Sequence, residues 1–200
     1  MTDQMNEQEL NDRLSLIEGM IAEGRRHTQN WGWAFVLWGI VYYVAIAWAA
    51  WGRSPWAWPV AVAVGVAATI AIGSSRGSGH PKTTLGRAIG SIWIGVGISM
   101  SVLFFALGAS GRLTDQHVFI AVASAMLGMA NGASAILLRW KVQLACAIVW
   151  WAAAVGATFG SDTQSQVAFL VAIFLCQIAF GIYGTIAQGR NNKPRITAHA

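Results

Sequence analysis

The stretch WGWAFVLWGIVYYVAIAWAAWGRSPWAWP, residues 31–59, decides the fold of this chain. It holds seven of the eleven tryptophans, at and between the ends of two apolar runs. A helix needs about 20 apolar residues to cross roughly 30 Å of hydrocarbon. Indole rings gather where hydrocarbon meets water, because each has an apolar body and one N–H donor. Six of the seven tryptophans fit that boundary, whereas Trp38 lies deeper. The stretch therefore predicts two membrane spans joined by a short turn at GRSP.

The rest of the chain repeats this pattern. Of its 200 residues, 56% are hydrophobic and only 10% are charged, whereas soluble domains carry about 25% charged residues. The apolar runs predict six spans, at about 31–51, 56–74, 88–109, 117–138, 142–159 and 166–187. We expect an all-α polytopic membrane protein whose six transmembrane helices form three hairpins. The predicted domains are a cytoplasmic amphipathic helix (1–28), the six-helix transmembrane domain (29–189) and a disordered basic tail (190–200).

The basic residues predict how the chain is threaded. Eleven of the thirteen Lys and Arg residues lie at alternate span ends: Arg13, Arg25, Arg26, Arg76, Lys82, Arg87, Arg139, Lys141, Arg190, Lys193 and Arg195. Only Arg53 and Arg112 lie at the opposite ends. The positive-inside rule then predicts that both termini are cytoplasmic. Because the positive charge lies beside the spans and not on a soluble face, we expect a lipid bilayer as partner and no nucleic acid.

The segment before the first span has a regular apolar period. Leu10, Leu14, Ile17 and Ile21 recur at spacings of four, three and four residues, which predicts an apolar seam on a helix. Helices that lie on a membrane surface usually have a basic polar face, whereas this one is acidic until its last turn. The favoured interpretation is a face for self-association or for a cytoplasmic protein partner. The alternative is a helix that merely stiffens the entry to the first span.

Small and polar residues within the spans suggest how the helices pack. Gly65, Gly128, Gly132 and Gly181 lie in ridges of small residues, which let helix backbones approach closely in a bilayer. Two deep amides, Asn131 and Gln177, could bond to each other across the bundle or face a polar cavity.

Deep aromatic residues are open to two interpretations. Trp38, Trp93 and Trp150 could line a ligand pocket, or they could simply pack against other helices and lipid.

Motifs for catalysis are missing from the sequence. No Asp, Glu, Lys, Arg or His lies in the middle of a span, which argues against a proton-coupled carrier. HExxH, CxxC and GxSxG do not occur, so we expect no catalytic, cofactor-binding or metal-binding residues and no enzyme. An outer-face active site built from Asp115, His117 and Asp162 is the least favoured possibility.

The loop SSRGSGHPKTTLGR, residues 74–87, fails as a phosphate-binding motif because His80 and Pro81 separate Gly79 from Lys82. We expect its basic residues Arg76, Lys82 and Arg87 to contact anionic lipid head groups.

Three segments carry a resemblance: SLIEGMIAEGRR (15–26), WGWAFVLWG (31–39) and LGRAIGSIWIGVGISM (85–100). In helix order and in the placing of Trp and Gly, the chain resembles a group of small, uncharacterised bacterial inner-membrane proteins with six spans. The resemblance implies a bacterial inner membrane and carries no activity.

These patterns favour a regulatory or scaffolding module that self-associates or recruits a partner through residues 7–24. The alternative is a small transporter or channel for a neutral or apolar solute, lined by Asn131, Gln177 and the deep aromatic rings. A membrane enzyme comes third.

Overall fold

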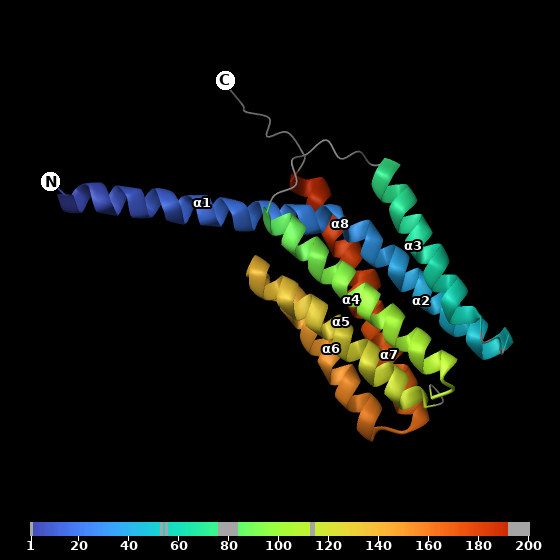
Figure 1. The fold of residues 1–200 in the computed structure, drawn as a ribbon. Coiled ribbons are helices and arrows are strands. Elements are labelled where there is room, and N and C mark those ends of the chain that lie inside the picture. The colour runs from blue at the N-terminus through green and yellow to red at the C-terminus, as the bar shows by residue number, and fades with distance from the viewer. Residues whose placement is uncertain (1, 53, 55, 76–83, 113–114, 192–200) are drawn as a thin grey trace. The chain divides into compact units, whose positions relative to one another are not determined.

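The computed structural model describes residues 2–52, 54, 56–75, 84–112 and 115–191. Within these ranges the regular structure is helical, with no strand (Figure 1). In chain order the elements are α1 (Thr2–Asn30), α2 (Gly32–Gly52), α3 (Ala57–Ser75), α4 (Thr84–Ala109), α5 (Gln116–Leu138), α6 (Lys141–Phe159), α7 (Asp162–Ile173), the π-helix η1 (Phe174–Ala179) and α8 (Phe180–Asn191).

The prediction of six membrane-spanning helices is confirmed. Five of the candidate spans are α2 to α6, and the sixth is the continuous helix Asp162–Ala187, which runs through α7, η1 and most of α8. Each is long and apolar enough to cross a membrane, and each boundary lies within four residues of its predicted position. The agreement arises because span length and hydropathy are both set by the thickness of the hydrocarbon layer.

The contacts divide the chain into two compact units. Unit 1 comprises Met1–His27 and His80–Phe169, and unit 2 comprises Thr28–Gly79 and Leu170–Ala200. The predicted arrangement in three hairpins is not confirmed. In unit 1 the most extensive pairing joins α5 to α6, and the hairpin scheme assigns these two helices to different hairpins. The predicted domain boundaries near residues 28 and 189 remain predictions.

In unit 1, α5 and α6 pack through an indole that lies on glycines. The side chain of Trp151 covers Gly128 and Gly132, and a Cβ at Gly132 would lie 2.9 Å from its Cη2. Ala147 also faces Gly132 across the contact. Gly128 and Gly132, both predicted as packing residues, therefore form the flat surface on which this ring rests.

In unit 2, α2 packs along α8 with their backbones close together. A Cβ at Gly181 would lie 2.6 Å from the carbonyl oxygen of Gly32, and a Cβ at Gly32 would lie 2.7 Å from that of Gly181. The rings of Phe35 and Phe180 meet edge to face at 5.1 Å. Because both residues are glycines, the backbones of α2 and α8 approach to a distance that a Cβ on either residue would prevent. Such close approach is expected for helices packed in a bilayer.

The sixth span contains a six-residue π-helix that the sequence did not predict. This segment, η1, includes Gln177, whose side chain is buried. Helix α2 approaches η1 at Gly39, where a Cβ would lie 2.8 Å from the Ile178 side chain. A π-helical turn places one extra residue in the helix and so shifts the face on which later side chains lie. Apolar periodicity over one span is too coarse to reveal that shift.

The Gly32–Gly181 contact makes a prediction about stability. Gly181→Ala should lower the melting temperature of the detergent-solubilised protein, because its Cβ would meet backbone atoms, which cannot move aside; overpacking costs about 1–3 kcal/mol. Gly73→Ala is the matched control in the same unit, since its Cβ would meet nothing closer than 3.9 Å. Size-exclusion chromatography after heating measures both variants. Equal melting temperatures for the two variants would contradict the proposed close contact.

Candidate functional site

The apolar seam of α1 is exposed. Leu10, Leu14 and Ile17 are 58%, 50% and 52% exposed, and Ile21 is partly buried. Every described side chain from Gln8 to Met20 is exposed to solvent in the isolated chain. The seam residues share one face of the helix because their spacings follow its 3.6-residue repeat. This face therefore makes no packing contact that buries it within the part of the chain that the structure describes.

The base of α1, by contrast, is tied to unit 1. The guanidinium of Arg25 donates through Nε to the carbonyl oxygen of Leu138 and through Nη2 to that of Arg139, both at 2.6 Å. These acceptors lie at the C-terminal end of α5, where carbonyl groups lack partners within the helix and the helix dipole is negative. Arg139 ends α5 in the left-handed conformation, with φ 50°.

Gly24 makes room for this contact between α1 and α5. A Cβ at that position would lie 2.6 Å from Leu85 and 2.8 Å from Leu138. From sequence, Arg25 was expected only to orient the chain in the membrane. In the structure it also caps another helix more than a hundred residues away, and no local pattern signals such a partner.

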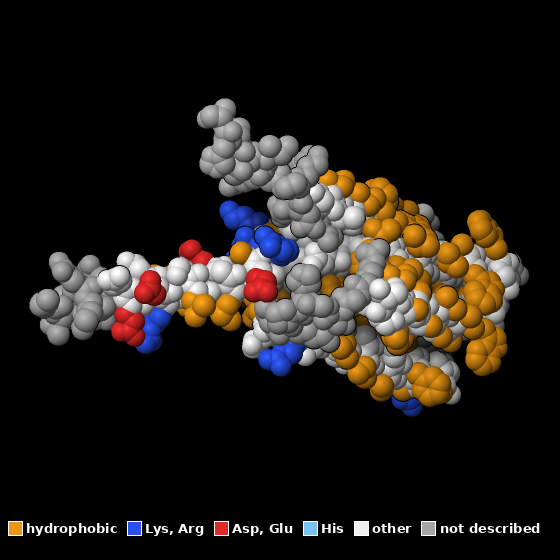
Figure 2. Space-filling view, turned by 90° about the horizontal axis from the view of Figure 1, so that it is seen from above, with side chains coloured by type: hydrophobic (Ala, Val, Ile, Leu, Met, Phe, Trp, Pro, Cys, Tyr) orange, Lys and Arg blue, Asp and Glu red, His pale blue; other side chains and the backbone are white. Residues whose placement is uncertain are grey.

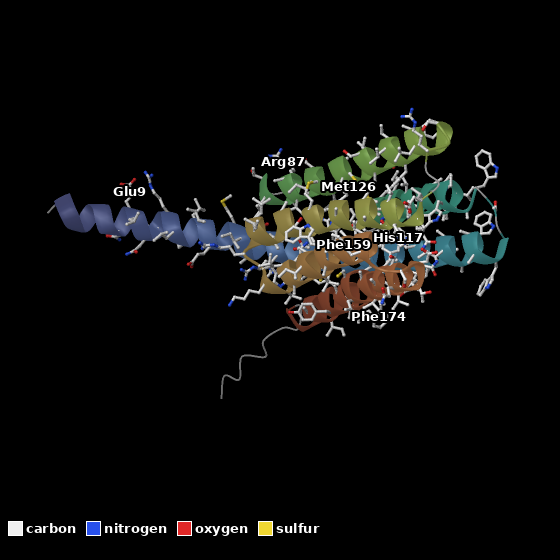
Figure 3. The ribbon with its side chains drawn as sticks, turned by 90° about the horizontal axis from the view of Figure 1, so that it is seen from below. Glu9, Arg87, His117, Met126, Phe159 and Phe174 are labelled. Atoms are coloured by element: carbon white, nitrogen blue, oxygen red, sulfur yellow. The ribbon has the colours of Figure 1, made fainter. Side chains whose placement is uncertain are left out.

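The predicted lipid-contacting residues are only partly described. Arg76 and Lys82 lie outside the described residues. Arg87 lies in the first turn of α4 with an exposed side chain (Figure 3), where it is available to a head group.

The residues predicted to line one pocket fall in different units. Trp38 and Gln177 belong to unit 2, whereas Trp93, Asn131 and Trp150 belong to unit 1. In unit 2 the ring of Trp38 lies 5.7 Å from that of Tyr42, which lies 6.3 Å from Trp58. Gly65 is part of this cluster, because a Cβ there would lie 3.2 Å from Val41 and 3.4 Å from Trp38. Packing between α2 and α3 accounts for the position of Trp38.

Trp93 and Trp150 have different surroundings in unit 1. Trp93 is half-buried on α4. Trp150 is fully buried, and its ring meets that of Phe169 at 6.0 Å in an edge-on arrangement.

A strip of buried polar groups runs along one face of the α5–α6 pair. Its members, called the polar strip below, are Ser124, Asn131, Ser134, Gln143 and Trp150, each with no exposed surface. Six of their atoms have no hydrogen-bond partner among the described residues: Ser124 Oγ, Asn131 Oδ1, Ser134 Oγ, Gln143 Nε2, Gln143 Oε1 and Trp150 Nε1. Only the Asn131 amide nitrogen is bonded, to the Leu127 carbonyl oxygen at 2.9 Å. A buried polar atom without a partner costs about 1–3 kcal/mol.

Sequence reasoning found part of this strip. Asn131 and Trp150 were predicted as pocket residues, whereas Gln143 was noted only as a deep polar side chain, Ser124 only as a small packing residue, and Ser134 was not predicted. The signal that could have found them is helical spacing, since Asn131 follows Ser124 by seven residues and Trp150 follows Gln143 by seven.

At the other end of α5, His117 joins three helices (Figure 3). Its Nδ1 lies 2.7 Å from the carbonyl oxygen of Ala157 in α6, and its Nε2 lies 2.7 Å from Oδ1 of Asp162 in α7. The backbone N–H of His117 donates to the carboxylate of Asp115, which caps α5. The residues of the least favoured prediction, Asp115, His117 and Asp162, are therefore close together.

The geometry does not make Ser165 a nucleophile. Its Oγ lies 2.9 Å from His117 Nδ1, which resembles part of a catalytic triad. In a triad the ring nitrogen that faces the serine must be free to accept its proton. Here the same nitrogen also faces the Ala157 carbonyl oxygen, which only accepts, so it must carry a proton. The side chain of Ser165 is fully buried as well.

The contacts of His117 predict that stability depends on pH. Nε2 faces the Asp162 carboxylate and Nδ1 faces the Ala157 carbonyl oxygen, and the ring can donate to both acceptors only when it carries two protons. The stabilisation should be present at about pH 5 and lost toward about pH 8, the range in which histidine changes charge. The titratable side chains beside the ring are Asp115 and Asp162; α6 contributes only a carbonyl group.

Melting temperatures of wild type and of His117→Phe across that range measure this effect. The difference between the two proteins should be largest in acid. Asp162→Asn should flatten the profile, because it removes the negative charge that faces Nε2. A difference that does not change with pH would refute the interpretation.

These features define the class of the protein: a polytopic α-helical membrane protein with an exposed apolar face on its first helix. Comparisons with protein-family models, curated proteins and solved structures found no match for this chain.

Proposed function

We propose that this chain is a non-enzymatic regulatory or scaffolding module of a bacterial inner membrane, which self-associates or recruits a cytoplasmic protein through α1. The supporting observation is that α1 is fixed at its base by Arg25 while its seam stays exposed. A helix that only stiffened the chain would need no apolar face. The eleven-to-two distribution of basic residues supports cytoplasmic termini, and the resemblance supports the inner membrane.

The seam alone would bind weakly. Burying the exposed parts of Leu10, Leu14 and Ile17 contributes about 1 kcal/mol each. A total of about 3 kcal/mol corresponds to a dissociation constant of roughly 6 mM. Confinement in one membrane raises the effective concentration of two such helices, so binding that is negligible in dilute detergent can be substantial there. The test therefore belongs in intact membranes.

The charged side chains on the surface of α1 indicate what kind of partner this helix favours. Figure 2 shows acidic and basic side chains beside apolar ones along this helix. Glu9, Asp12 and Glu18 are exposed, and Arg13 pairs with Glu9 along the same face. A mixed charge pattern around an apolar seam is typical of helices that pair with another helix, and it gives little attraction to anionic lipid.

Site-specific photo-crosslinking in cells tests this proposal. A photoreactive amino acid at Leu14 should give a discrete product, whose mass distinguishes a second copy from another protein. The same amino acid at Leu16 is the matched control, because Leu16 is 66% exposed but lies on another face of α1. We expect at least tenfold less product from position 16. Ile17→Glu should reduce the product from position 14, because a charge would enter the buried seam. Equal products from both positions, or none from either, would disprove the proposal.

A second candidate function is a small transporter or channel for a neutral or apolar solute. The polar strip is the observation that favours it, since it brings neutral hydrogen-bonding groups deep into two membrane helices. Deleting residues 1–24 separates the two functions. The module should lose its association with the partner, measured by co-purification because the deletion also removes position 14, whereas a transporter reconstituted in vesicles should keep its flux.

A further inference from the structure

We infer that the polar strip of α5 and α6 is a binding site for small neutral molecules that both donate and accept hydrogen bonds, water being the smallest. This inference goes beyond the proposed role of α1 and does not depend on it. It starts from six buried atoms that the described residues leave without partners. In hydrocarbon such atoms cannot turn to solvent, so each must find a partner from outside the helix pair or remain unsatisfied.

The polar groups of the strip are spread along the helix pair. Gly132 faces Ala147, and Gly128 faces Trp151, which fixes the register of the two helices. By that register Gln143 is level with Ile136, and Trp150 with Met129. At 1.5 Å per residue, the strip runs about 18 Å from the level of Gln143 to Ser124.

Neighbouring members of the strip are separated by about 3–8 Å along the helix axis. One or two small molecules can bridge such separations with hydrogen bonds of ordinary length.

The chemistry of the strip selects neutral guests. Asn131 Oδ1 and Gln143 Oε1 accept, Gln143 Nε2 and Trp150 Nε1 donate, and the two serine hydroxyls do both. None of these groups is charged, so an ion entering the strip would lose its hydration without a counter-charge. Water and small alcohols or amides match this set of donors and acceptors.

The chain carries its own reporter for this site. Cys146 follows Gln143 by three residues and precedes Trp150 by four, so the three share one face of α6. It is not in a disulfide and is buried. Thiols react with methanethiosulfonates as thiolates, and a thiolate forms readily only where polar molecules can solvate it. The modification rate at Cys146 therefore reports whether small molecules enter the strip.

The experiment compares two reagents on the full chain in lipid vesicles, with mass spectrometry of peptides to distinguish Cys146 from Cys176. The neutral reagent is methyl methanethiosulfonate, and the charged one is its trimethylammonium-ethyl analogue. We expect Cys146 to react at least tenfold faster with the neutral reagent. Gln143→Met keeps the side-chain length but removes both polar atoms, and it should slow that reaction at least tenfold. Thr158→Val, on an exposed position of the same helix, is the matched control and should leave the rate unchanged.

Several outcomes would overturn the inference. Equal rates with both reagents would mean an open aqueous cleft, and no reaction with either would mean a dry interface. An unchanged neutral rate in Gln143→Met would mean that the reagent arrives through lipid.

The melting temperature adds an independent measure: a rise in Gln143→Met would show that the amide was unsatisfied and unoccupied, whereas an unchanged or lower value supports occupancy. If Gln143→Met does not fold, Ser134→Ala takes its place in both measurements. Crosslinking through α1 should be unchanged in these variants, so failure here is distinct from failure of the module proposal.

Discussion

The structure depends on one constraint: within hydrocarbon, every backbone N–H and C=O group must find its partner inside the protein. That constraint makes each span a helix. It also acts at the helix ends, where carbonyl groups are left without partners. The C-terminal end of α5 meets this need through Arg25 of α1, which donates to the carbonyl oxygens of Leu138 and Arg139. The same bonds fix the base of α1, so the position of the exposed seam follows from the capping of a membrane helix.

Because lipid is as apolar as leucine, burial of apolar side chains gives little force between helices in a bilayer. Close packing has to supply the attraction instead. Both units use glycine for this purpose but in different ways. In unit 2, Gly32 and Gly181 bring two backbones together, whereas in unit 1 Gly128 and Gly132 form a flat bed for the indole of Trp151. The second arrangement accounts for the position of Trp151 in the middle of its span.

The six spans could be predicted from the sequence because length and hydropathy are properties of one segment at a time. The pairing of α5 with α6, the π-helical turn at Gln177 and the bond from Arg25 could not, because each depends on which residues face one another in three dimensions. The candidate site shows the same limit. Asn131 and Gln177 are both deep amides that the sequence allows to bond to each other, yet they belong to different units. Ser134 lies near Asn131 because the two are three residues apart on α5, and Gln143 lies near it because of the register between α5 and α6. Depth in the membrane alone reveals neither relation.

Charge and polarity are separated along α5. Its first turn is held by His117, whose ring bonds to α6 and α7, and its last turn is held by the guanidinium of Arg25. Between these charged ends, the buried polar groups of the helix are neutral. A neutral group in hydrocarbon costs far less than an ion, so such groups can be kept deep in the membrane when guests satisfy them. The separation therefore favours neutral molecules at the middle of the helix and restricts proton-dependent behaviour to the end that carries His117.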